Sequence, residues 1–386
     1  MVKSIYKIAV VLVVILVAST AGFVAYNGTF NNSGTNTGKT TITVTDMQNR
    51  TMVLNAPVER IILLESSKTE ELIALDGNIA DKIVGWDKDF ENNAGDGYAI
   101  FVEKYPQLAD IDDVGALDDN TFSVEKAIAL KPDVVIMHSW MYVWCEDAVK
   151  DALSKLTSAG IPVVFVDFYM EPIANSPKSM LLLGQILGQE DRAQDIVDFY
   201  NSHVESVYSR LANISDVKPT VYVEQGLKGP SEYDITEGDE GWGSIVKMAG
   251  GNNIAESLLG KSSKALSPEY VIDQSPDIIV ITGRHWSNPG SVKMGYTATA
   301  SDTKSTMDGY IARSGWDTIN AVKNHKVYAI YQGYTFSVYS FVELEAFAKW
   351  FYPQEFQDIN PDATIRQYYE QFMPIDFSGT FIFSYY

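Results

Sequence analysis

Apolar residues recur at helical spacing in one long stretch near the middle of the chain, Gln189 to Leu211. Steps of three and four residues separate its apolar members, which are Ala193, Ile196, Val197, Tyr200, Val204, Val207, Tyr208 and Leu211. Polar residues such as Asp195 and Asp198 fall between them, so the pattern predicts an amphipathic helix. A helix of this length would extend about 34 Å, which is enough to cross a small domain. We therefore expect it to connect two parts of the molecule.

Before this helix, short apolar runs without polar alternation are separated by helical patterns. Strands are predicted at 61–64, 82–86, 134–137 and 161–166, and helices at 68–75, 123–130 and 148–159. An alternating pattern at 41–55 predicts a hairpin ahead of them, whereas the stretch after Trp86, rich in Asp, Asn and Gly, is predicted to be a loop. Strands that are apolar throughout are typical of a parallel sheet with helices on both faces.

After the long helix the same order of elements recurs. Strands are predicted at 219–223, 278–282 and 326–331, and helices at 243–249, 268–274 and 314–322. The similarity is greatest between 124–137 (VEKAIALKPDVVIM) and 268–281 (PEYVIDQSPDIIVI), which share a Glu, a short apolar helix, Pro-Asp seven and eight residues after that Glu, and an apolar strand. Such self-similarity indicates two lobes built alike, although Pro-Asp before a buried strand is also common in α/β proteins. The predicted fold class is α/β, with one lobe on each side of the long helix.

The composition, with 46% hydrophobic residues in a chain of 386, is that of a folded globular protein. The formal net charge of −21 would repel nucleic acid and anionic lipid surfaces, so neither is expected as a partner. Cys145 is the only cysteine, which excludes an internal disulfide and a cluster of thiolate metal ligands from this chain. We interpret it as an inert thiol.

The amino-terminal residues 1–26 combine Lys3 and Lys7 with a long apolar run, and we interpret them as a signal peptide or an N-terminal membrane anchor. Residues 27–40 have the composition of a flexible tether. They include GTNTGKT (34–40), which has one residue too few between its glycines for a phosphate-binding loop and does not lie between a strand and a helix. ATP hydrolysis is therefore expected to belong to a partner.

The chain resembles the substrate-binding proteins of ABC importers for iron-siderophore complexes and cobalamin. In that family two Rossmann-like α/β lobes are joined by one long rigid helix, and the ligand cleft lies between the lobes. The segments that carry the resemblance cover nearly all of residues 41–373 and are TITVTDMQNRTMVLNAPVERIILL, VEKAIALKPDVVI, GIPVVFVD, GGNNIAE, LSPEYVIDQSPDIIVITG and WFYPQEFQDINPDATIRQYYEQF. The last segment is more similar to the ends of iron-complex receptors than to those of cobalamin receptors. The resemblance implies an N-terminal α/β lobe at 41–172, linking helices at 173–213, a C-terminal α/β lobe at 214–345 and a C-terminal helical extension at 346–386.

Ligands of open α/β sheets bind outside the carboxyl ends of the strands, so the loops that follow the predicted strands are expected to line the cleft. From these loops we select as ligand-binding candidates Ser66, Trp86, His138, Trp140, Tyr142, Arg284, His285, Trp286 and Tyr334. The aromatic side chains offer flat apolar faces with a polar edge, which suits an organic chelate around a metal. Arg284 could pair with a carboxylate or catecholate of the ligand. The alternative interpretation is that the aromatic residues are buried supports of the core.

Four residues at matching points of the two lobes have more than one interpretation. His138 and His285 could ligate an iron or cobalt ion, although a hydrogen bond to ligand or backbone is the more common role, and we assign no metal-ligating residue. Glu125 and Glu269 begin two short helices, where negative charge also stabilises the helix dipole. The resemblance implies that these two carboxylates, one in each lobe, dock on arginines of the membrane permease.

The function that the resemblance implies is a non-enzymatic receptor that captures a metal chelate, in the first instance an iron-siderophore, and delivers it to an ABC importer. A cobalamin or haem receptor of the same fold and a receptor for bare zinc or manganese are the alternatives, although four histidines are few for a bare-metal site. An enzyme with this fold is a further alternative for which the sequence shows no nucleophile motif. The expected partners are the chelate, a permease dimer with cytoplasmic ATPase subunits, and the membrane through the N-terminal segment. The protein is expected to be an extracytoplasmic monomer without a cofactor of its own, since the iron chelate or corrinoid is cargo.

Overall fold

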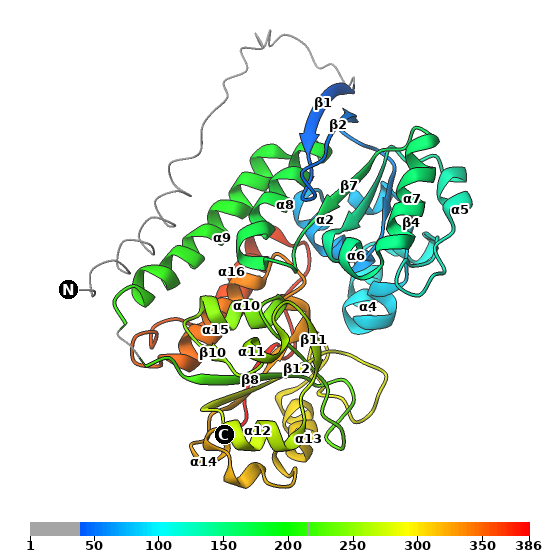
Figure 1. Cartoon of the computed structure of the whole chain (residues 1–386). Coiled ribbons are helices and arrows are strands. Elements are labelled where there is room, and N and C mark those ends of the chain that lie inside the picture. Colours follow the sequence, from blue (N-terminus) through cyan, green and yellow to red (C-terminus); the bar gives the residue numbers. More distant parts are fainter. Residues whose placement is uncertain (1–38, 215–216) are drawn as a thin grey trace, which may run out of the picture. The chain divides into compact units, whose positions relative to one another are not determined.

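Two five-stranded sheets, connected by a pair of long helices, organise the part of the chain that can be described (Figure 1). The computed structural model describes residues 39–214 and 217–386. The predicted signal peptide or anchor at 1–26, and the tether at 27–40 apart from its last two residues, lie outside them. Within the described residues, no helix combines the length and the apolar character needed to cross a bilayer.

The first sheet is parallel throughout, as predicted, and its strand order is β5-β4-β3-β6-β7. Its strands are β3 (Ile61–Leu63), β4 (Ile83–Trp86), β5 (Asp112–Asp113), β6 (Val134–His138) and β7 (Val163–Val166). Ile62 and Val135 face one buried cluster, whereas Ile61 and Val134 face another. Because successive side chains of a strand point to opposite faces, strands that are covered on both faces must be apolar throughout.

Helices cover both faces of this first sheet and a hairpin precedes it. The hairpin is β1 (Thr40–Thr45) with β2 (Thr51–Ala56), and the helices are α2 (Thr69–Leu75), α3 (Asp89–Asn93), α4 (Gly95–Lys104), α5 (Val124–Ala129), α6 (Ser139–Trp144) and α7 (Glu146–Ser158). The prediction of a loop after Trp86 was wrong, because α3 and α4 occupy that stretch. Phe90 and Phe101 on these two helices are fully buried against each other, so tertiary packing stabilises helices that contain the poor helix formers Gly95 and Gly97.

Two long helices connect the sheets, α8 (Pro172–Leu187) and α9 (Glu190–Leu211). The prediction of an amphipathic helix is confirmed in α9, whose buried residues are Ala193, Ile196, Val197, Tyr200, Val204 and Val207. The two helices pack closely, since a Cβ atom on Gly184 of α8 would lie 2.4 Å from that of Ala193. Near its beginning, α9 is tied to the first half by Arg192, which donates to the carbonyl of Ala74 at 3.0 Å. Near its end, Arg210 pairs with Asp358 of the second half at 2.5 Å.

The second sheet has the order β10-β8-β12-β13-β14 and is parallel except for its last strand. Its strands are β8 (Thr220–Gln225), β10 (Asn252–Asn253), β12 (Ile278–Gly283), β13 (Val327–Tyr331) and β14 (Ile382–Ser384), and a separate pair is formed by β9 (Ile235–Glu237) and β11 (Ser263–Ala265). Its helices are α10 (Gly241–Met248), α11 (Glu256–Leu259), α12 (Pro268–Gln274), α13 (Ala300–Ile311) and α14 (Asn320–Lys323). The helix predicted at 314–322 is therefore interrupted, and only its second part is α-helical.

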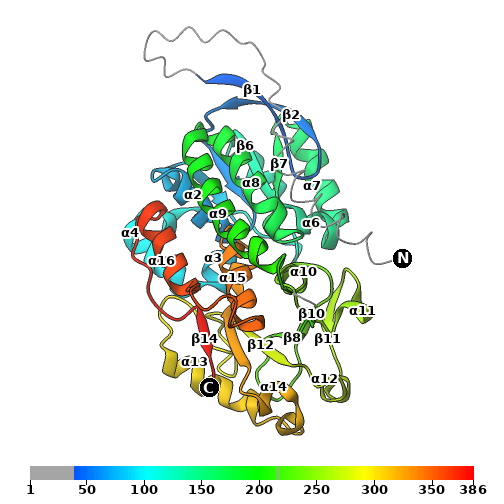
Figure 2. The same cartoon turned by 90° about the vertical axis from the view of Figure 1, so that its left-hand side faces the viewer.

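The carboxyl-terminal segment forms two helices, α15 (Ser340–Phe351) and α16 (Pro361–Phe372), that pack against each other beside α9 (Figure 2). A helical extension was predicted at 346–386. That prediction is incomplete, because the segment ends in β14, which pairs with β13 at the edge of the second sheet. Helix α15 also contacts α8 and α10. One buried apolar cluster therefore runs from the inner face of the first sheet through α8, α9 and α15 to the second sheet, which makes this connection stiff.

The repeat seen in the sequence corresponds to two equivalent units, α5 with β6 and α12 with β12. Ser123 caps the first helix by accepting a hydrogen bond from the amide of Lys126 at 3.2 Å, and Ser267 caps the second by accepting from Tyr270 at the same distance. Each unit ends in a fully buried strand near the middle of its sheet. The prediction of two lobes built alike is confirmed at this level.

Candidate functional site

The turn after β3 is held in an uncommon conformation by a buried carboxylate. Glu65 has a left-handed backbone (φ 75°), which is rare for residues other than glycine. Asp87, which follows β4, accepts hydrogen bonds from the amides of Glu65 at 2.5 Å and Ser66 at 2.8 Å. Ser66 is fully buried and its hydroxyl accepts from the amide of Phe90 at 2.9 Å. The predicted ligand residue Ser66 therefore shapes the turn and is not presented to the cleft.

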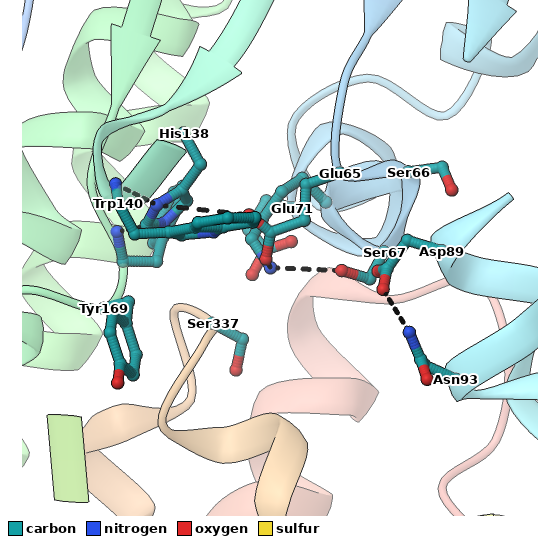
Figure 3. A network of polar contacts seen from close by, with 12 residues as sticks. Glu65, Ser66, Ser67, Glu71, Asp89, Asn93, His138, Trp140, Tyr169 and Ser337 are labelled. Carbon is teal, nitrogen blue, oxygen red and sulfur yellow. Dashed lines mark hydrogen bonds and ion pairs between the residues drawn. The ribbon is translucent and has the colours of Figure 1, made fainter. Parts of the chain in front are cut away.

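Glu65 is the centre of a network at the carboxyl edge of the first sheet (Figure 3). One of its carboxylate oxygens lies 2.9 Å from Lys68 Nζ, and the other accepts a hydrogen bond from Trp140 Nε1 at 2.6 Å. Burial alone would lower the pKa of Lys68, but the carboxylates of Glu65 and Glu71 outweigh burial and raise it. Lys68 is therefore a buried cation at the site. Ser337, from a loop of the second half, lies opposite this network in Figure 3.

His138 is enclosed beside the network and has a structural role in this arrangement. Its side chain is fully buried, Nε2 accepts a hydrogen bond from the amide of Phe168 at 2.8 Å, and Nδ1 faces the amide of Trp140 at 3.4 Å. Burial lowers the pKa of His138 to about 3, against the opposing charge of Asp167, so the ring is neutral. Because Nε2 accepts the hydrogen bond from Phe168, the single hydrogen of the neutral ring is on Nδ1, and neither nitrogen offers a lone pair to a metal.

The carboxyl edges of the two sheets enclose a small cavity of about 20 Å³. The first half contributes Ser67, Lys68, Glu70, Glu71 and Ala94, and the second half contributes Arg284, Tyr331, Gly333, Phe336, Ser337 and Tyr339. Burial alone would lower the pKa of Arg284, but Tyr331 and the carboxylate of Asp89 raise it. Lys68 and Arg284 thus bring two cations to this cavity from opposite halves. Arg284 is the predicted ligand residue that the structure places most directly at the site.

The remaining candidates differ in exposure and in their neighbours. Trp86 and Tyr334 are buried in the core, the first beside Tyr98 and the second among the aromatic rings of Tyr331, Tyr339 and Phe381. Tyr142 packs edge-on against Phe165 in the cluster on the outer face of the first sheet. Trp286 is half-buried and His285 is exposed, with Nδ1 4.0 Å from a carboxylate oxygen of Asp96. Of the nine candidates, Trp140 joins the Glu65 network with His138 beside it, Arg284 lines the interlobe cavity, and the other six line neither.

A larger hollow of about 520 Å³ lies at the carboxyl edge of the first sheet, beside the same network. It is lined by the turns after β3, β4 and β5 and by the first residues of α6. Its charged lining consists of Glu65, Asp87, Lys88, Asp89, Asp113, Asp118 and Asp119. The volume is within the range of small-molecule sites, about 300–1,000 Å³, and six of these seven charges are negative.

Carboxylates and tyrosines hold the two halves together on both flanks of the interlobe cavity. On one flank, Glu70 of α2 accepts hydrogen bonds from Tyr296 at 2.9 Å and from Tyr339 and Tyr369 at 3.2 Å. On the other flank, Tyr169, which follows β7, donates to Glu237 at 2.6 Å and stacks on Phe336. A cavity of about 20 Å³ does not hold a bulky ligand unless contacts of this kind separate.

Glu70 should make the stability of the protein depend on pH. Burial, with the neighbouring charge of Glu71, raises the pKa of Glu70 from 4.5 to about 7 against the lowering effect of the three tyrosine hydroxyls. Because the folded pKa is above the unfolded one, the stabilising contribution is complete below pH about 4.5 and is lost as the pH rises through about 7. Its full size is on the order of 3 kcal/mol. We expect the thermal unfolding midpoint to fall between pH about 5 and pH about 8.

The Glu70→Gln variant tests this expectation, since its amide stays neutral at every pH. Its midpoint should fall less than that of the wild type when both are measured by circular dichroism at constant ionic strength. Glu103→Gln is a matched control, because Glu103 is exposed on α4 and its replacement should keep the wild-type slope. An unchanged slope in Glu70→Gln would show that the buried carboxyl does not titrate in this range.

Sequence reasoning missed the charged residues at the start of α2 and directly before it, which matter most here. Lys68, Glu70 and Glu71 were included in a helix predicted at 68–75, where a charged first turn is typical of a solvent-exposed start. In the structure all three are buried. The available signal was Glu65 followed by Lys68 directly after an apolar strand, at the edge where ligands of parallel sheets bind.

Glu125 and Glu269 occupy equivalent, exposed positions in the first turns of α5 and α12. The neighbouring lysines are engaged with other partners, since Lys126 pairs with Asp112 at 2.9 Å and Lys155 with Asp151 at 2.7 Å. Each half therefore presents one such carboxylate to solvent.

Two similar parallel-sheet lobes, joined by a long helix and meeting at their carboxyl edges over a shared cavity, define a two-lobed receptor for a small ligand. Residues 61–333 match the family model of periplasmic binding proteins, and the chain belongs to this family. The matched residues cover most of both lobes.

Individual relatives agree with this assignment. The solved structure of the TroA-like periplasmic binding protein FepB from Veillonella parvula is 33% identical, with a TM-score of 0.83 over 89% of this chain and 99% of that chain. YvrC, an ABC transporter substrate-binding lipoprotein of Bacillus subtilis, is 27% identical over 75% of this chain and 78% of its own length. The ferric-anguibactin-binding protein FatB of Vibrio anguillarum is 27% identical over 64% of this chain and 70% of its own. The predicted resemblance is confirmed, and the chain is a substrate-binding receptor of the ABC importer class.

Proposed function

We propose that this receptor captures a metal chelate, in the first instance an iron-siderophore, between its lobes and delivers it to a membrane permease outside the cytoplasm. The observation that carries this proposal is the interlobe cavity, which receives Lys68 and Ser67 from one carboxyl edge and Arg284 from the other. A ligand held there contacts both lobes, so its presence can set their relative position. The ferric-anguibactin-binding relative FatB supports the choice of ligand class.

A chelate fits the site better than a bare metal ion. Among residues 39–214 and 217–386, no group of three or more His, Cys, Asp or Glu side chains is arranged to hold a metal ion. Zinc and manganese receptors need such a shell of direct ligands. The donors and acceptors around the cavity instead suit the organic shell of a complex, and Trp140 beside them offers an aromatic face.

A tryptophan-fluorescence titration tests the proposed function. Purified protein is titrated with ferric hydroxamates, ferric catecholates, cobalamin and haem, and separately with zinc and manganese after treatment with a chelator. We expect at least one ferric chelate to quench the fluorescence with a dissociation constant of about 1 µM or less. Saturation by cobalamin or haem alone would move the proposal to those ligands, and a response to bare metal alone would contradict it.

The permease is the second proposed partner. We assign its docking to Glu125 and Glu269, which are exposed at equivalent points of the two lobes. The joining helices α8 and α9 and the continuous core set the distance between these carboxylates. Binding to a permease dimer through one carboxylate per lobe also requires only one copy of the receptor.

A further inference from the structure

We propose that the captured chelate carries a protonated amine and that Glu71 binds this ammonium group in the interlobe cavity. The inference rests on the function proposed above and adds the charge class of the ligand. It differs from the expectation that Arg284 selects an anionic chelate, because it assigns the charge class of the ligand to Glu71, which lines the same cavity.

Glu71 has the hydrogen-bonding capacity that such a ligand would use. Its side chain is fully buried on α2, and one carboxylate oxygen, Oε1, accepts from the amide of Val338 at 3.0 Å. The other oxygen, Oε2, is buried without a hydrogen-bond partner among the described residues. A buried carboxylate oxygen without a partner costs free energy, so a donor in the cavity would stabilise the closed protein.

Among the described residues, neither cation of the cavity makes an ion pair or a hydrogen bond with Glu71 at contact distance. Lys68 lies 2.9 Å from Glu65, and Nε of Arg284 is itself buried without a hydrogen-bond partner, so an acceptor atom of the same ligand can bind there. Glu70 receives three tyrosine hydroxyls. Burial raises the pKa of Glu71, and a cation at Oε2 would favour its ionised form.

The size of the cavity agrees with a single small donor group. About 20 Å³ is close to the smallest space that holds one water molecule, and an ammonium group is of similar size. A catechol ring would need more room. The cavity therefore suits the tip of an amine-bearing arm.

The hollow at the carboxyl edge of the first sheet supports the same charge class. Its lining contains six carboxyl groups and one lysine, and Glu65 lines this hollow while pairing with Lys68 of the interlobe cavity. The Glu65–Lys68 pair therefore lies between the hollow, which Glu65 lines, and the interlobe cavity, which Lys68 lines. A chelate with net positive charge would be attracted to this edge, whereas a triply negative ferric catecholate would be repelled.

A matched pair of probes tests the proposal. The first is a ferric trihydroxamate that ends in a primary amine, and the second is the same complex with a hydroxyl group in place of the amine, which is of similar size and removes the charge and two donor hydrogens. We expect the wild type to bind the amine form about 10- to 100-fold more tightly, the range for a hydrogen bond between charged groups. Glu71→Gln should reduce this preference to less than about threefold.

The control variant is Glu370→Gln, which removes one exposed carboxylate from α16 and should keep the wild-type preference. Equal binding of the two probes by the wild type would overturn the proposal. This result needs only the wild type, so it holds even if Glu71→Gln fails to fold. A preference that persists in folded Glu71→Gln would overturn the role of Glu71. An interlobe cavity that binds only a water molecule, and no amine, would overturn it as well. If neither probe nor any other ferric chelate bound, the proposed function itself would fail.

Discussion

Replacing Arg313 by alanine is expected to lower the free energy of unfolding by about 3–5 kcal/mol, the range for breaking a buried ion pair on one side. Arg313 pairs bidentately with the fully buried Glu224, with Nη1 2.6 Å from Oε2 and Nη2 2.8 Å from Oε1. The guanidinium also lies over the rings of Tyr233, Tyr310 and Trp316. Alanine would leave the carboxylate of Glu224 uncompensated in an apolar setting.

The loss should extend to the ligand site, because this ion pair fixes the loop after β8. Glu224 also accepts from the amide of Asp234 at 3.0 Å, and the chain then continues into β9, which carries Glu237. Glu237 in turn accepts the hydroxyl of Tyr169 across the lobes. A loosened loop would therefore weaken one of the two flanks that hold the lobes together.

Urea unfolding measured by fluorescence and by circular dichroism gives the free energy. Lys304→Ala is the control, since Lys304 pairs with Asp308 on the surface at 2.9 Å, where an ion pair contributes about 0.5 kcal/mol or less. The double variant Arg313→Met with Glu224→Leu should be less destabilised than Arg313→Ala, because it leaves no buried charge. A loss of less than about 1 kcal/mol in Arg313→Ala would contradict the buried-pair explanation.

The elements of the fold were predictable where burial leaves a periodic pattern. The apolar face of α9 repeats at helical spacing, and strands such as β6 and β12 are apolar throughout because both of their faces are covered. The helices α3 and α4 were not predictable in this way. Their stretch contains Asp, Asn and Gly, and its helical state depends on contacts with distant residues, such as that between Phe101 and Tyr296.

The site was predictable to the level of its loops and not of its side chains. The carboxyl ends of parallel strands indicated the correct edge, but which residue of a loop faces the cavity depends on the turn. The left-handed backbone of Glu65 turns Ser66 into the core. His138 ends β6 with an ordinary extended backbone, yet its side chain is fully buried. Buried charges such as Lys68 and Glu71 follow no periodic pattern, because their burial depends on partners from other segments.

Replacing both Glu125 and Glu269 by alanine is expected to abolish import while leaving the affinity for the ligand nearly unchanged. Both carboxylates are exposed and lie outside the residues that line the interlobe cavity and the larger hollow. Charges at the rim of an interface act on recognition and association. With one carboxylate on each lobe, the permease would respond both to the presence of the receptor and to its alignment. Each single variant should retain part of the transport rate.

Uptake of radioactive iron supplied as the identified chelate, together with titration of the purified variants, separates the two effects. Glu103→Ala with Glu370→Ala, which removes two exposed carboxylates from other elements, controls for the loss of net charge and should transport normally. If the docking assignment is correct, exchanging the matching permease arginines for glutamates should block import by the wild type, and Glu125→Arg with Glu269→Arg should restore it. A double alanine variant that loses ligand affinity, or one that still transports at the wild-type rate, would refute docking through this pair, because contacts confined to the permease interface cannot produce either result.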